Sequence, residues 1–558
     1  MQVPALSLLW PENRSVYADR TRKLGGAAID NLELPALAAR MAPGRERSES
    51  VLEMLTELCA DEDVIAYRQE VIDDLLASPG LVDRLREVTE HLENLSLLAR
   101  EASANEDASL WRCFSRLKEL DAYAGCVTGI RQALANAGFR SRGLLRLQAE
   151  VTRTTEDPSF RELQETIRSL DVELGEIQSI SLGLNLDSSL NPVEATLVSV
   201  NKFRYRAAPG LLGAIRSAGS RTPRLSTGEE DGEPAPMSRL HPVGNDRRDP
   251  IMYHLYKDIE NILRPVVRDL HAGLRRYARL SARPLLGLIP ELVFYLGCAD
   301  LAAGMRAAGL PLCRPAIAPA DERVCVIRDA YNIHLALHML EQGDALPSGM
   351  VFNDIRFDDG GRIQILTGPN RGGKTVYTAA VGLAQVLFQA GMHVPGSEAR
   401  MSPVDTVYTH FPVDESRTVE LGRLGEEASR LHAIFDEATP HSLVLLNESL
   451  ASTNLTEAVY IAQDVVKSLR FLGARVVYNT HMHDLAACAE AINREVPGDS
   501  AVISLVTGMA DGRRSYRIQP GAPMGKSYAR DIAMKFGICF EQVVHGLEAR
   551  RTPDFPCA

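Results

Sequence analysis

The residues best suited to chemistry form a glycine-rich run, Gly368-Pro-Asn-Arg-Gly-Gly-Lys-Thr375. The run fits G-x-x-x-x-G-K-[S/T], the pattern of a phosphate-binding loop. Its surroundings predict a strand over Arg362–Thr367 before the loop and a helix over Val376–Ala390 after it. Backbone N–H groups and the start of that helix would then face phosphate oxygens. The sequence therefore predicts a nucleotide site rather than a ligand-free glycine turn.

Two residues of the loop have individual expected roles, and the others are expected to contact the nucleotide. Lys374 supplies a positive charge to the β- and γ-phosphates, and Thr375 offers its hydroxyl oxygen to Mg²⁺. We expect ATP and Mg²⁺ as the cofactors. The predicted nucleotide contacts are Gly368, Pro369, Asn370, Arg371, Gly372, Gly373, Lys374, Thr375 and Val376.

A second apolar strand, in SLVLLNES, ends near an acidic residue. Glu448 is predicted to orient and deprotonate the attacking water, although a glutamate here can also be purely structural. Asn447 stands where a metal-directed aspartate is expected, and it is the second predicted metal ligand after Thr375. An amide brings no negative charge to Mg²⁺, so the sequence predicts weak metal binding and slow hydrolysis.

Polar residues near two further strand ends complete the predicted site. His481 follows the strand in ARVVYNT and is predicted to act on the γ-phosphate or on the water, the alternative being a structural histidine. Ser452, Thr453 and Asn454 are expected either to meet a partner subunit or to form an ordinary loop. The predicted catalytic residues are thus Lys374, Glu448 and His481.

Bulk composition separates the function classes only weakly. The 558 residues contain 45% hydrophobic and 24% charged residues, with a net charge of −12, so any DNA contact needs a local basic surface. No pair of the nine cysteines has the C-x-x-C spacing of a zinc knuckle or redox pair, and their odd number in a chain of this size favours reduced thiols. The start of the chain does not resemble a signal peptide, and the apolar stretch from Pro284 to Gly297 is shorter than a bilayer span. We expect a cytoplasmic protein without membrane segments.

The apolar residues of the chain follow two different patterns, one before and one after about residue 350. Apolar residues recur at helical spacing from about 48 to 104, with Asp61 as an expected helix cap, and long polar-faced helices are expected from 105 to about 180. These helices form either a protruding arm or an ordinary bundle. Residues 216–250 have the composition of a loop, and helical spacing resumes over 251–307. From residue 350 short apolar strands alternate with helices, as in a parallel α/β sheet.

Several of these segments together resemble the MutS family of mismatch-repair ATPases. LTGPNRGGKTV is similar to the family's ITGPNMGGKST, SLVLLNES to SLVLMDEI, and NTHMHDL to THYFEL, which places His481 on the family's switch histidine. MVFNDI, HVPGSEA and YRIQPGAPMGKSYARDIAMKFGI resemble further segments of the same ATPase domain. The likeness is looser for VIAYRQEVIDDLL and for PELVFYLGCADLAAGMRAAGLPLCRPAI in the first half.

The resemblance implies a fold class and a division of the chain. An α/β P-loop NTPase domain of the ABC/MutS type would lie at the C-terminus, after a mainly α-helical core with a helical lever or clamp arm. The expected parts are an N-terminal segment 1–45, a first core part 46–104, an arm 105–250 with loop 216–250, a returning core part 251–345, and an ATPase domain 346–558 that ends in a helical dimerisation segment.

Three departures limit what the resemblance implies. The chain starts close to the helical core, so we expect a short form without the mismatch-reading domain. Asn447 replaces the family's aspartate. The segment from Leu421 to Glu426 lacks the family's Ser-Thr pair; Arg423 could replace it or be a solvated charge, and Glu427 behind it is expected to be structural.

Three functions follow from these observations. The first is an ATP-dependent protein that binds double-stranded or branched DNA as a head-to-tail homodimer and slowly hydrolyses ATP to ADP. The second is a nucleotide-gated dimerisation module with negligible turnover. The third is a scaffold whose helical half binds another protein, which the acidic net charge permits equally well.

Overall fold

The computed structural model describes residues 6–104, 109–135, 137–175, 179–189, 192–201, 241–242, 277, 282–412, 422–450, 454–510, 513–523, 534, 537 and 539–550. The chain divides into two compact units, each assembled from separated stretches. Unit 1 contains residues 1–6, 84–136 and 147–289, and unit 2 contains residues 7–83, 137–146 and 290–558.

Unit 1 is built from long helices and a small antiparallel sheet. Strand β4 pairs with β3 on one side and with β5 on the other. Its elements, of which the first and the third begin in unit 2, are α5 (Pro79–Ala104), α6 (Ser109–Leu134), α7 (Arg142–Glu156), α8 (Pro158–Gly175), β3 (Ser179–Leu186), β4 (Pro192–Asn201), β5 (His241–Pro242) and α12 (Arg283–Leu286).

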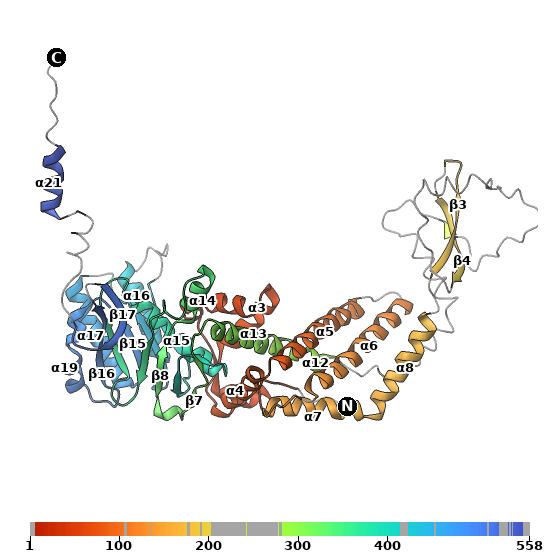
Figure 1. The fold of residues 1–558 in the computed structure, drawn as a ribbon, viewed down its shortest axis with the longest axis horizontal. Coiled ribbons are helices and arrows are strands. Elements are labelled where there is room, and N and C mark those ends of the chain that lie inside the picture. Colours follow the sequence, from red (N-terminus) through yellow and green to blue (C-terminus); the bar gives the residue numbers. More distant parts are fainter. Residues whose placement is uncertain are drawn as a thin grey trace, which may run out of the picture. The chain divides into compact units, whose positions relative to one another are not determined.

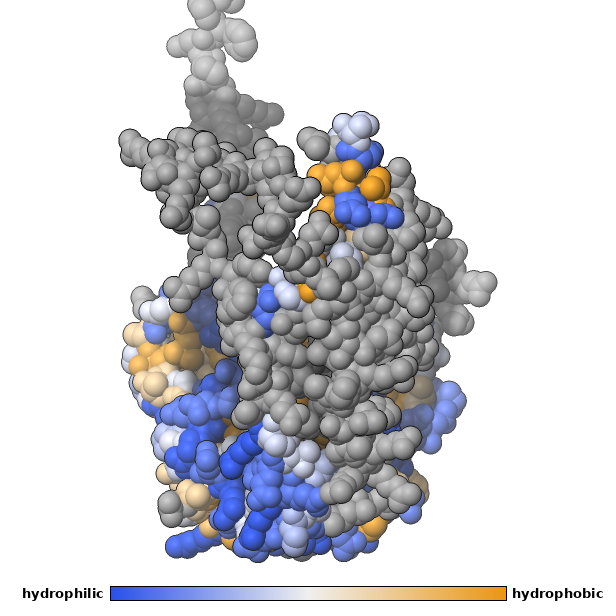
Figure 2. Space-filling model, turned by 90° about the vertical axis from the view of Figure 1, so that its right-hand side faces the viewer, coloured by the Kyte–Doolittle hydropathy of each residue, from blue (hydrophilic) through white to orange (hydrophobic). Residues whose placement is uncertain are grey.

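The β3–β4 hairpin corrects the prediction of helices up to about residue 180. Helix α8 ends at Gly175, and β3 begins at Ser179. Leu182, Leu184 and Leu186 alternate along β3, which is a strand period rather than a helical one, and all three are exposed. Figure 2 shows a mainly hydrophilic described surface with separate hydrophobic patches. The predicted loop 216–250, apart from β5, lies outside the described residues, as does the first part, 251–276, of the stretch 251–307 that was predicted to be helical.

Unit 2 contains the sheet that carries the glycine loop. Its strand order is β13-β14-β15-β10-β16-β17, and neighbours pair in parallel except β17, which runs antiparallel to β16. The strands are β10 (Ile363–Thr367), β13 (Val407–His410), β14 (Leu443–Asn447), β15 (Arg475–Asn479), β16 (Val502–Ala510) and β17 (Arg513–Pro520). Strands β10, β14 and β15 are buried along their whole length, as the near-continuous apolar runs predicted.

Helices cover both faces of this sheet (Figure 1). Val444 and Leu446 point into a core formed with the helices between residues 422 and 495. Leu445 points to the opposite face, which is covered by α15, the helix that begins at the glycine loop, and by Leu32. The covering helices are α15 (Lys374–Gln389), α16 (Gly422–Glu437), α17 (Leu455–Leu472), α18 (His483–Ala487) and α19 (Ala489–Glu495). A further helix, α21 (Phe540–Arg550), follows β17.

Strands in the region expected as a returning helical core join unit 2. A second sheet has the order β7-β12-β8-β9, and β6 pairs with β11. The bounds are β6 (Leu312–Cys313), β7 (Ala316–Ile317), η3 (Ala320–Glu322), β8 (Cys325–Ala330), α14 (Ile333–Gln342), β9 (Asn353–Phe357), β11 (Val394–Pro395) and β12 (Glu398–Met401). The region between 312 and 345 is therefore mixed rather than helical.

The N-terminal part of unit 2 packs against the far end of α15. Its elements are η1 (Arg14–Arg20), β1 (Thr21–Lys23), α1 (Gly26–Asn31), α2 (Leu34–Met41), α3 (Arg45–Thr56), β2 (Glu57–Cys59) and α4 (Glu62–Ala77). Asp61 caps α4 by accepting from Asp63 N and Val64 N, which confirms the predicted cap. Arg68 of α4 is fully buried and donates to Gln389 O, 2.9 Å away, at the C-terminal end of α15.

Helix α13 (Leu288–Ala307) is the most apolar helix among the described residues. The stretch from Arg283 to Ala307 is long and apolar enough to cross a membrane, so the prediction of too short a stretch was wrong. However, 67% of its apolar window is buried within the protein, as in a core helix. Glu291 accepts from Ser7 Oγ at 2.7 Å, and burial raises the pKa of its carboxyl to about 7. These contacts are those of a helix packed in a globular core.

Candidate nucleotide-binding site

The glycine loop joins β10 to α15 at the carboxyl edge of the parallel sheet. Gly368 has φ +146° and Gly373 has φ +88°, both in the region that favours glycine. A Cβ on Gly368 would lie 1.9 Å from Thr507 Oγ1, so β16 leaves no space for a side chain there. The loop ends at the first turn of α15, whose free N–H groups suit an anion.

Lys374 is held inside the loop with only 5% of its side chain exposed. Its ammonium donates to Gly368 O at 3.2 Å and to Pro369 O at 3.4 Å, so the charge lies among the loop's own carbonyls. Burial lowers the pKa of Lys374, and the nearby carboxylate of Glu448 opposes that shift. A buried cation whose hydrogen bonds go only to uncharged carbonyls is well placed to receive an anionic ligand.

The other two predicted catalytic residues lie beside Lys374. Glu448 Oε1 is 3.8 Å from Lys374 Nζ and 3.0 Å from His481 Nε2. Glu448 has a left-handed backbone, with φ +51°, and its N–H donates to Asn479 O, so it turns out of β14 immediately after the strand ends. The structure thus brings together three residues that are far apart in the sequence.

The predicted metal position is a cluster of uncharged oxygens. Thr375 Oγ1 donates to Asn447 Oδ1 at 3.1 Å. Asn479, at the end of the neighbouring strand β15, donates to Asn447 Oδ1 and, at 3.4 Å, to Thr375 Oγ1. Hydroxyl and amide oxygens are suitable ligands for Mg²⁺, so the residue types fit the ion. Nevertheless, the described residues include no group of three or more His, Cys, Asp or Glu side chains that could hold a metal.

Asn479 is a residue of this site that the sequence did not predict. No motif singles it out, because only the pairing of Asn447 with Asn479 across β14 and β15 brings the two amides together. Its side chain is fully buried, and its Oδ1 has no hydrogen-bond partner. Other polar atoms of the loop and its surroundings are also buried without a partner: Thr367 Oγ1, His483 Nδ1 and Thr507 Oγ1.

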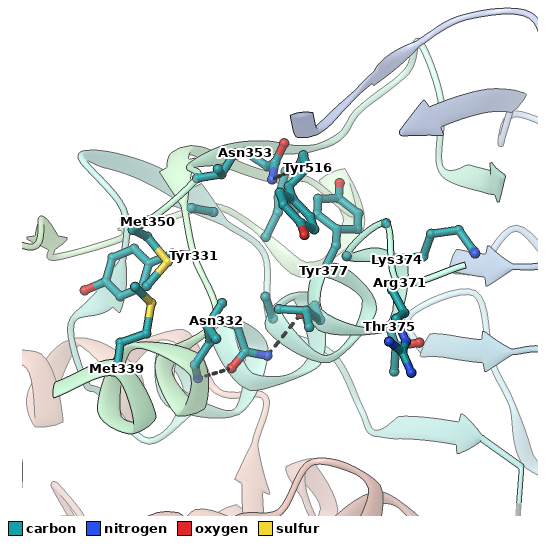
Figure 3. Close-up of a pocket in the computed structure, with 18 of the residues that line it drawn as sticks. Tyr331, Asn332, Met339, Met350, Asn353, Arg371, Lys374, Thr375, Tyr377 and Tyr516 are labelled. Atoms are coloured by element: carbon teal, nitrogen blue, oxygen red, sulfur yellow. Dashed lines mark hydrogen bonds between the residues drawn. The ribbon is translucent and has the colours of Figure 1, made fainter. Parts of the chain in front are cut away.

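A pocket of about 460 Å³ opens beside the loop. In Figure 3, Tyr331, Met339 and Met350 gather at one end of it, while Tyr516 and Tyr377 lie nearer the loop. The side chain of Lys374 points away from this pocket (Figure 3). An apolar pocket next to a phosphate-binding loop can hold the flat base of a nucleotide.

Two asparagines fix the walls of this pocket. Asn353 donates to Tyr516 O at 3.0 Å and accepts from Ile518 N at 2.7 Å, which ties β9 to β17. Asn332 caps α14 and donates to Val376 O at 3.0 Å in the first turn of α15. Tyr516 itself has φ +56°, and its ring would contact a Cβ placed on Gly373 at 3.5 Å. The sequence placed MVFNDI in the ATPase domain but gave no sign of these contacts.

A buried histidine supports the strand end that carries Glu448. His410, at the end of β13, lies 2.7 Å through Nδ1 from Ser449 Oγ. Burial lowers the pKa of His410 to about 4, and the charge of Arg430 acts in the same direction. The imidazole is therefore neutral at pH 7 and packs as part of the sheet. The sequence did not identify His410.

The remaining predicted positions are described in part. Asn454 caps α17 by accepting from Thr456 N, which is a structural role, while Ser452 and Thr453 lie outside the described residues. Glu427 is buried on α16, in line with the structural role expected for it. Leu421 and the side chain of Arg423 also lie outside the described part. The predicted cross-subunit contacts therefore stay predictions.

The fold and this site together define a P-loop, ATPase-type domain, with a phosphate loop on a parallel sheet and with a glutamate and a histidine just past the ends of two adjacent strands. Comparison with known families agrees: residues 364–550 match the MutS domain V and residues 60–308 match the MutS2 N-terminal domain. The chain belongs to the MutS family.

Individual relatives are similar over parts of their length. "Endonuclease MutS2" of Thermus thermophilus is 30% identical over 263 residues, 47% of this chain and 32% of the relative. "DNA mismatch repair protein MutS" of Haloquadratum walsbyi is 24% identical over 516 residues, 85% of this chain and 51% of the relative. The chain thus matches about a third of the first protein and about half of the second.

Proposed function

We propose that this chain is a MutS-like ATPase that binds ATP at residues 368–376 and couples the bound nucleotide to DNA. The observation that carries the proposal is the buried ammonium of Lys374, held within a left-handed glycine loop and within 3.8 Å of Glu448. A loop with a purely structural role would gain nothing from this arrangement, because burying a lysine ammonium without a hydrogen-bonded anion is costly.

Binding would exchange one set of contacts for another. Phosphate oxygens would replace the carbonyls of Gly368 and Pro369 around the ammonium of Lys374, while loop N–H groups donate to the same phosphates. The base would enter the pocket lined by Tyr331, Met350 and Tyr516. Its volume of about 460 Å³ suits a nucleoside.

Hydrolysis would depend on Glu448. Its carboxylate would accept a proton from the attacking water, and His481, 3.0 Å away, would hold it in place and face the γ-phosphate. Thr375 and Asn447 would hold Mg²⁺, and the ion would supply positive charge that stabilises the phosphate oxygens. Because Asn447 is uncharged, we expect turnover to be slow.

DNA binding is proposed on the strength of family membership. Relatives carry the names "DNA mismatch repair protein" and "Endonuclease MutS2". We propose double-stranded or branched DNA as the partner, bound by a homodimer whose ATPase domains pair head to tail in the cytoplasm. With a net charge of −12, binding would rely on local basic surfaces and weaken steeply with salt.

The test combines nucleotide and DNA. Purified protein is mixed at low salt with duplex, mismatched or four-way-junction DNA, with and without ATP, and complexes are resolved by gel shift while phosphate release is measured. We expect ATP-dependent DNA complexes and DNA-stimulated hydrolysis. Absence of binding to every DNA would refute the DNA part, and absence of ATP binding would refute the whole.

A second candidate is a nucleotide-gated module with negligible turnover. The observation that favours it is the contact of Asn447 with Asn479, which leaves the metal position without the expected carboxylate. Under this alternative, wild-type hydrolysis is at background and Asn447→Asp raises it, whereas turnover of wild type at an ordinary ATPase rate excludes it.

A further inference from the structure

The metal position of this site is built from amides, and this feature has a consequence for nucleotide binding. Building on the ATP binding proposed above, we propose that Asn447 and Asn479 form a neutral amide pair that lets the loop bind ATP largely without a divalent cation. Asn479 is then a positioning residue of the site, since it fixes the orientation of the Asn447 amide.

The pair is built into the sheet. Asn447 and Asn479 are the last residues of β14 and β15 and are direct partners in the parallel register, so their side chains lie on the same face. Both are buried, with 6% and 0% of their surface exposed. Asn479 Nδ2 donates to Asn447 Oδ1, which also accepts from Thr375 Oγ1 at 3.1 Å. Two neighbouring amides and one hydroxyl thus occupy the place where a P-loop ATPase has a carboxylate.

The pair is neutral whichever way its amides are turned. Exchanging the oxygen and nitrogen of either side chain changes the donor and the acceptor but adds no charge. The carboxylate of Glu448, the residue after Asn447, already faces two basic side chains, at 3.8 Å from Lys374 and 3.0 Å from His481. An incoming triphosphate therefore meets one fewer anion than in a site with an aspartate at position 447.

Removing that anion changes the coupling between ATP and metal. An aspartate here would repel the phosphates until a divalent cation arrived, so it would make nucleotide and cation bind cooperatively. Without it the repulsion is smaller and the cation gains less from the protein. Because coupling between two ligands is reciprocal, weak dependence of ATP affinity on metal also means weak dependence of metal affinity on the protein.

One oxygen of the amide pair is left without a hydrogen-bond partner. Its Oδ1 is completely buried and has no hydrogen-bond partner. A buried amide oxygen is rarely left unbonded unless a water, ion or ligand completes it. Asn479 thus adds a third uncharged polar group to Thr375 and Asn447 without adding a negative charge.

The experiment measures ATP affinity by calorimetry in excess EDTA and in Mg²⁺. For wild type we expect the two affinities to agree within about threefold, and for Asn447→Asp we expect about a tenfold or larger loss in EDTA, within the usual range of coupling between sites. Asn13→Asp is the matched control, because Asn13 caps η1 and an aspartate there adds the same charge outside the loop. We expect it to behave as wild type.

A wild-type loss in EDTA as large as that of Asn447→Asp would overturn the inference. If no form binds ATP under either condition, the proposed function itself fails. Asn479→Asp is the second variant, with its thermal midpoint measured alongside: at the metal position it should also make ATP binding cation-dependent. A lower midpoint with unchanged cation dependence would show that Asn479 is merely structural.

A measurement on wild type alone completes the test. Mn²⁺ is titrated into the protein–ATP complex and into free ATP and followed by electron paramagnetic resonance. We expect the protein to tighten Mn²⁺ binding by less than about threefold. Tightening of tenfold or more would mean that the amides hold the ion strongly, and the inference would be wrong.

Discussion

The two ends of helix α15 carry buried polar groups for opposite reasons. At the C-terminal end, Gln389 donates to Cys59 O at 3.0 Å and to Val404 O at 2.9 Å, and its Oε1 accepts from Val404 N at 3.0 Å. Arg68 donates to Gln389 O at 2.9 Å and to Leu9 O at 3.2 Å, with its guanidinium 4.6 Å from the Trp10 ring centre. This end is closed and fully bonded.

At the N-terminal end the bonding is incomplete. Lys374 meets only carbonyls at 3.2 and 3.4 Å and a carboxylate at 3.8 Å, and Asn479 Oδ1 and Thr507 Oγ1 have no partner. Unmet bonding capacity in a buried place is costly and is kept where a ligand completes it. One end of α15 is therefore built for stability and the other for binding.

The largest expected effect is at the closed end. Arg68→Ala leaves the carbonyls of Leu9 and Gln389 unpaired and opens a cavity beside Trp10, so we expect the free energy of unfolding to fall by about 4 kcal/mol. Urea unfolding measures it. Arg45→Ala, in an exposed pair with Glu49, is the control and should leave the curve unchanged. Equal effects of the two substitutions would contradict a structural role for Arg68.

Lys374→Ala tests the open end. Removing the ammonium should weaken ATP binding at least about a hundredfold, or about 2.7 kcal/mol, because charge-assisted bonds to the phosphates are lost. Equilibrium dialysis with labelled ATP measures the affinity. The midpoint of thermal unfolding should not fall. Burial lowers the pKa of Lys374, which means that the buried charge does not stabilise the fold. Lys467→Ala, on α17, is the control and should bind ATP normally; a loss of stability without a loss of affinity would reverse the comparison.

His410, at the end of β13, makes the stability of the fold depend on pH. Its folded pKa of about 4 lies below the ordinary value of 6.5, so the unfolded chain binds the proton more readily. The contribution of this histidine to the free energy of unfolding is present above pH 6.5 and is lost as pH falls toward 4. The free energy of unfolding should fall by about 2 kcal/mol between pH 7 and pH 5. His410→Asn should remove that part of the pH dependence, measured from unfolding curves. His432→Asn, on the exposed face of α16, should retain it.

The smallest effect is expected in the pocket. Tyr516→Ala removes a ring that lies over Gly373 beside the pocket, and we expect ATP affinity to fall about tenfold, or about 1.4 kcal/mol. Tyr516→Phe should keep most of the affinity, because the ring rather than the hydroxyl makes the contact. Tyr460→Ala, on the exposed face of α17, is the control. No change in Tyr516→Ala would place the base elsewhere.

The sequence predicted the local parts of the open end well. The strand before the loop begins one residue later than expected, at Ile363, and α15 begins at Lys374 rather than Val376. Loop glycines, the lysine and the strand-end glutamate are readable because each is set by spacing along the chain. In the structure Glu448 lies within 3.8 Å of Lys374 and 3.0 Å of His481, because the carboxyl ends of parallel strands share one edge, while the catalytic roles of the three residues stay predictions.

What the sequence could not give depends on pairing between distant segments. Asn479 belongs to the site only because the strand register places it beside Asn447. Tyr516 belongs to it only because its ring lies beside Gly373. Arg68 lies in the segment VIAYRQEVIDDLL, which resembles the family, but nothing in the neighbouring sequence shows that its side chain reaches the end of α15. The β3 strand was missed because its alternating leucines follow a long helical pattern without a clear break.

The division of unit 2 among distant stretches bears on how the protein is made. Residues 7–83 leave the ribosome long before residues 290–558, which complete the same unit. Leu32, 1% exposed in the folded protein, packs beside Gly382 of α15 and Leu445 of β14, which are synthesised much later. Until those segments are synthesised, apolar side chains of the nascent chain are exposed to solvent. Folding in the cell should therefore depend on chaperones that bind these side chains.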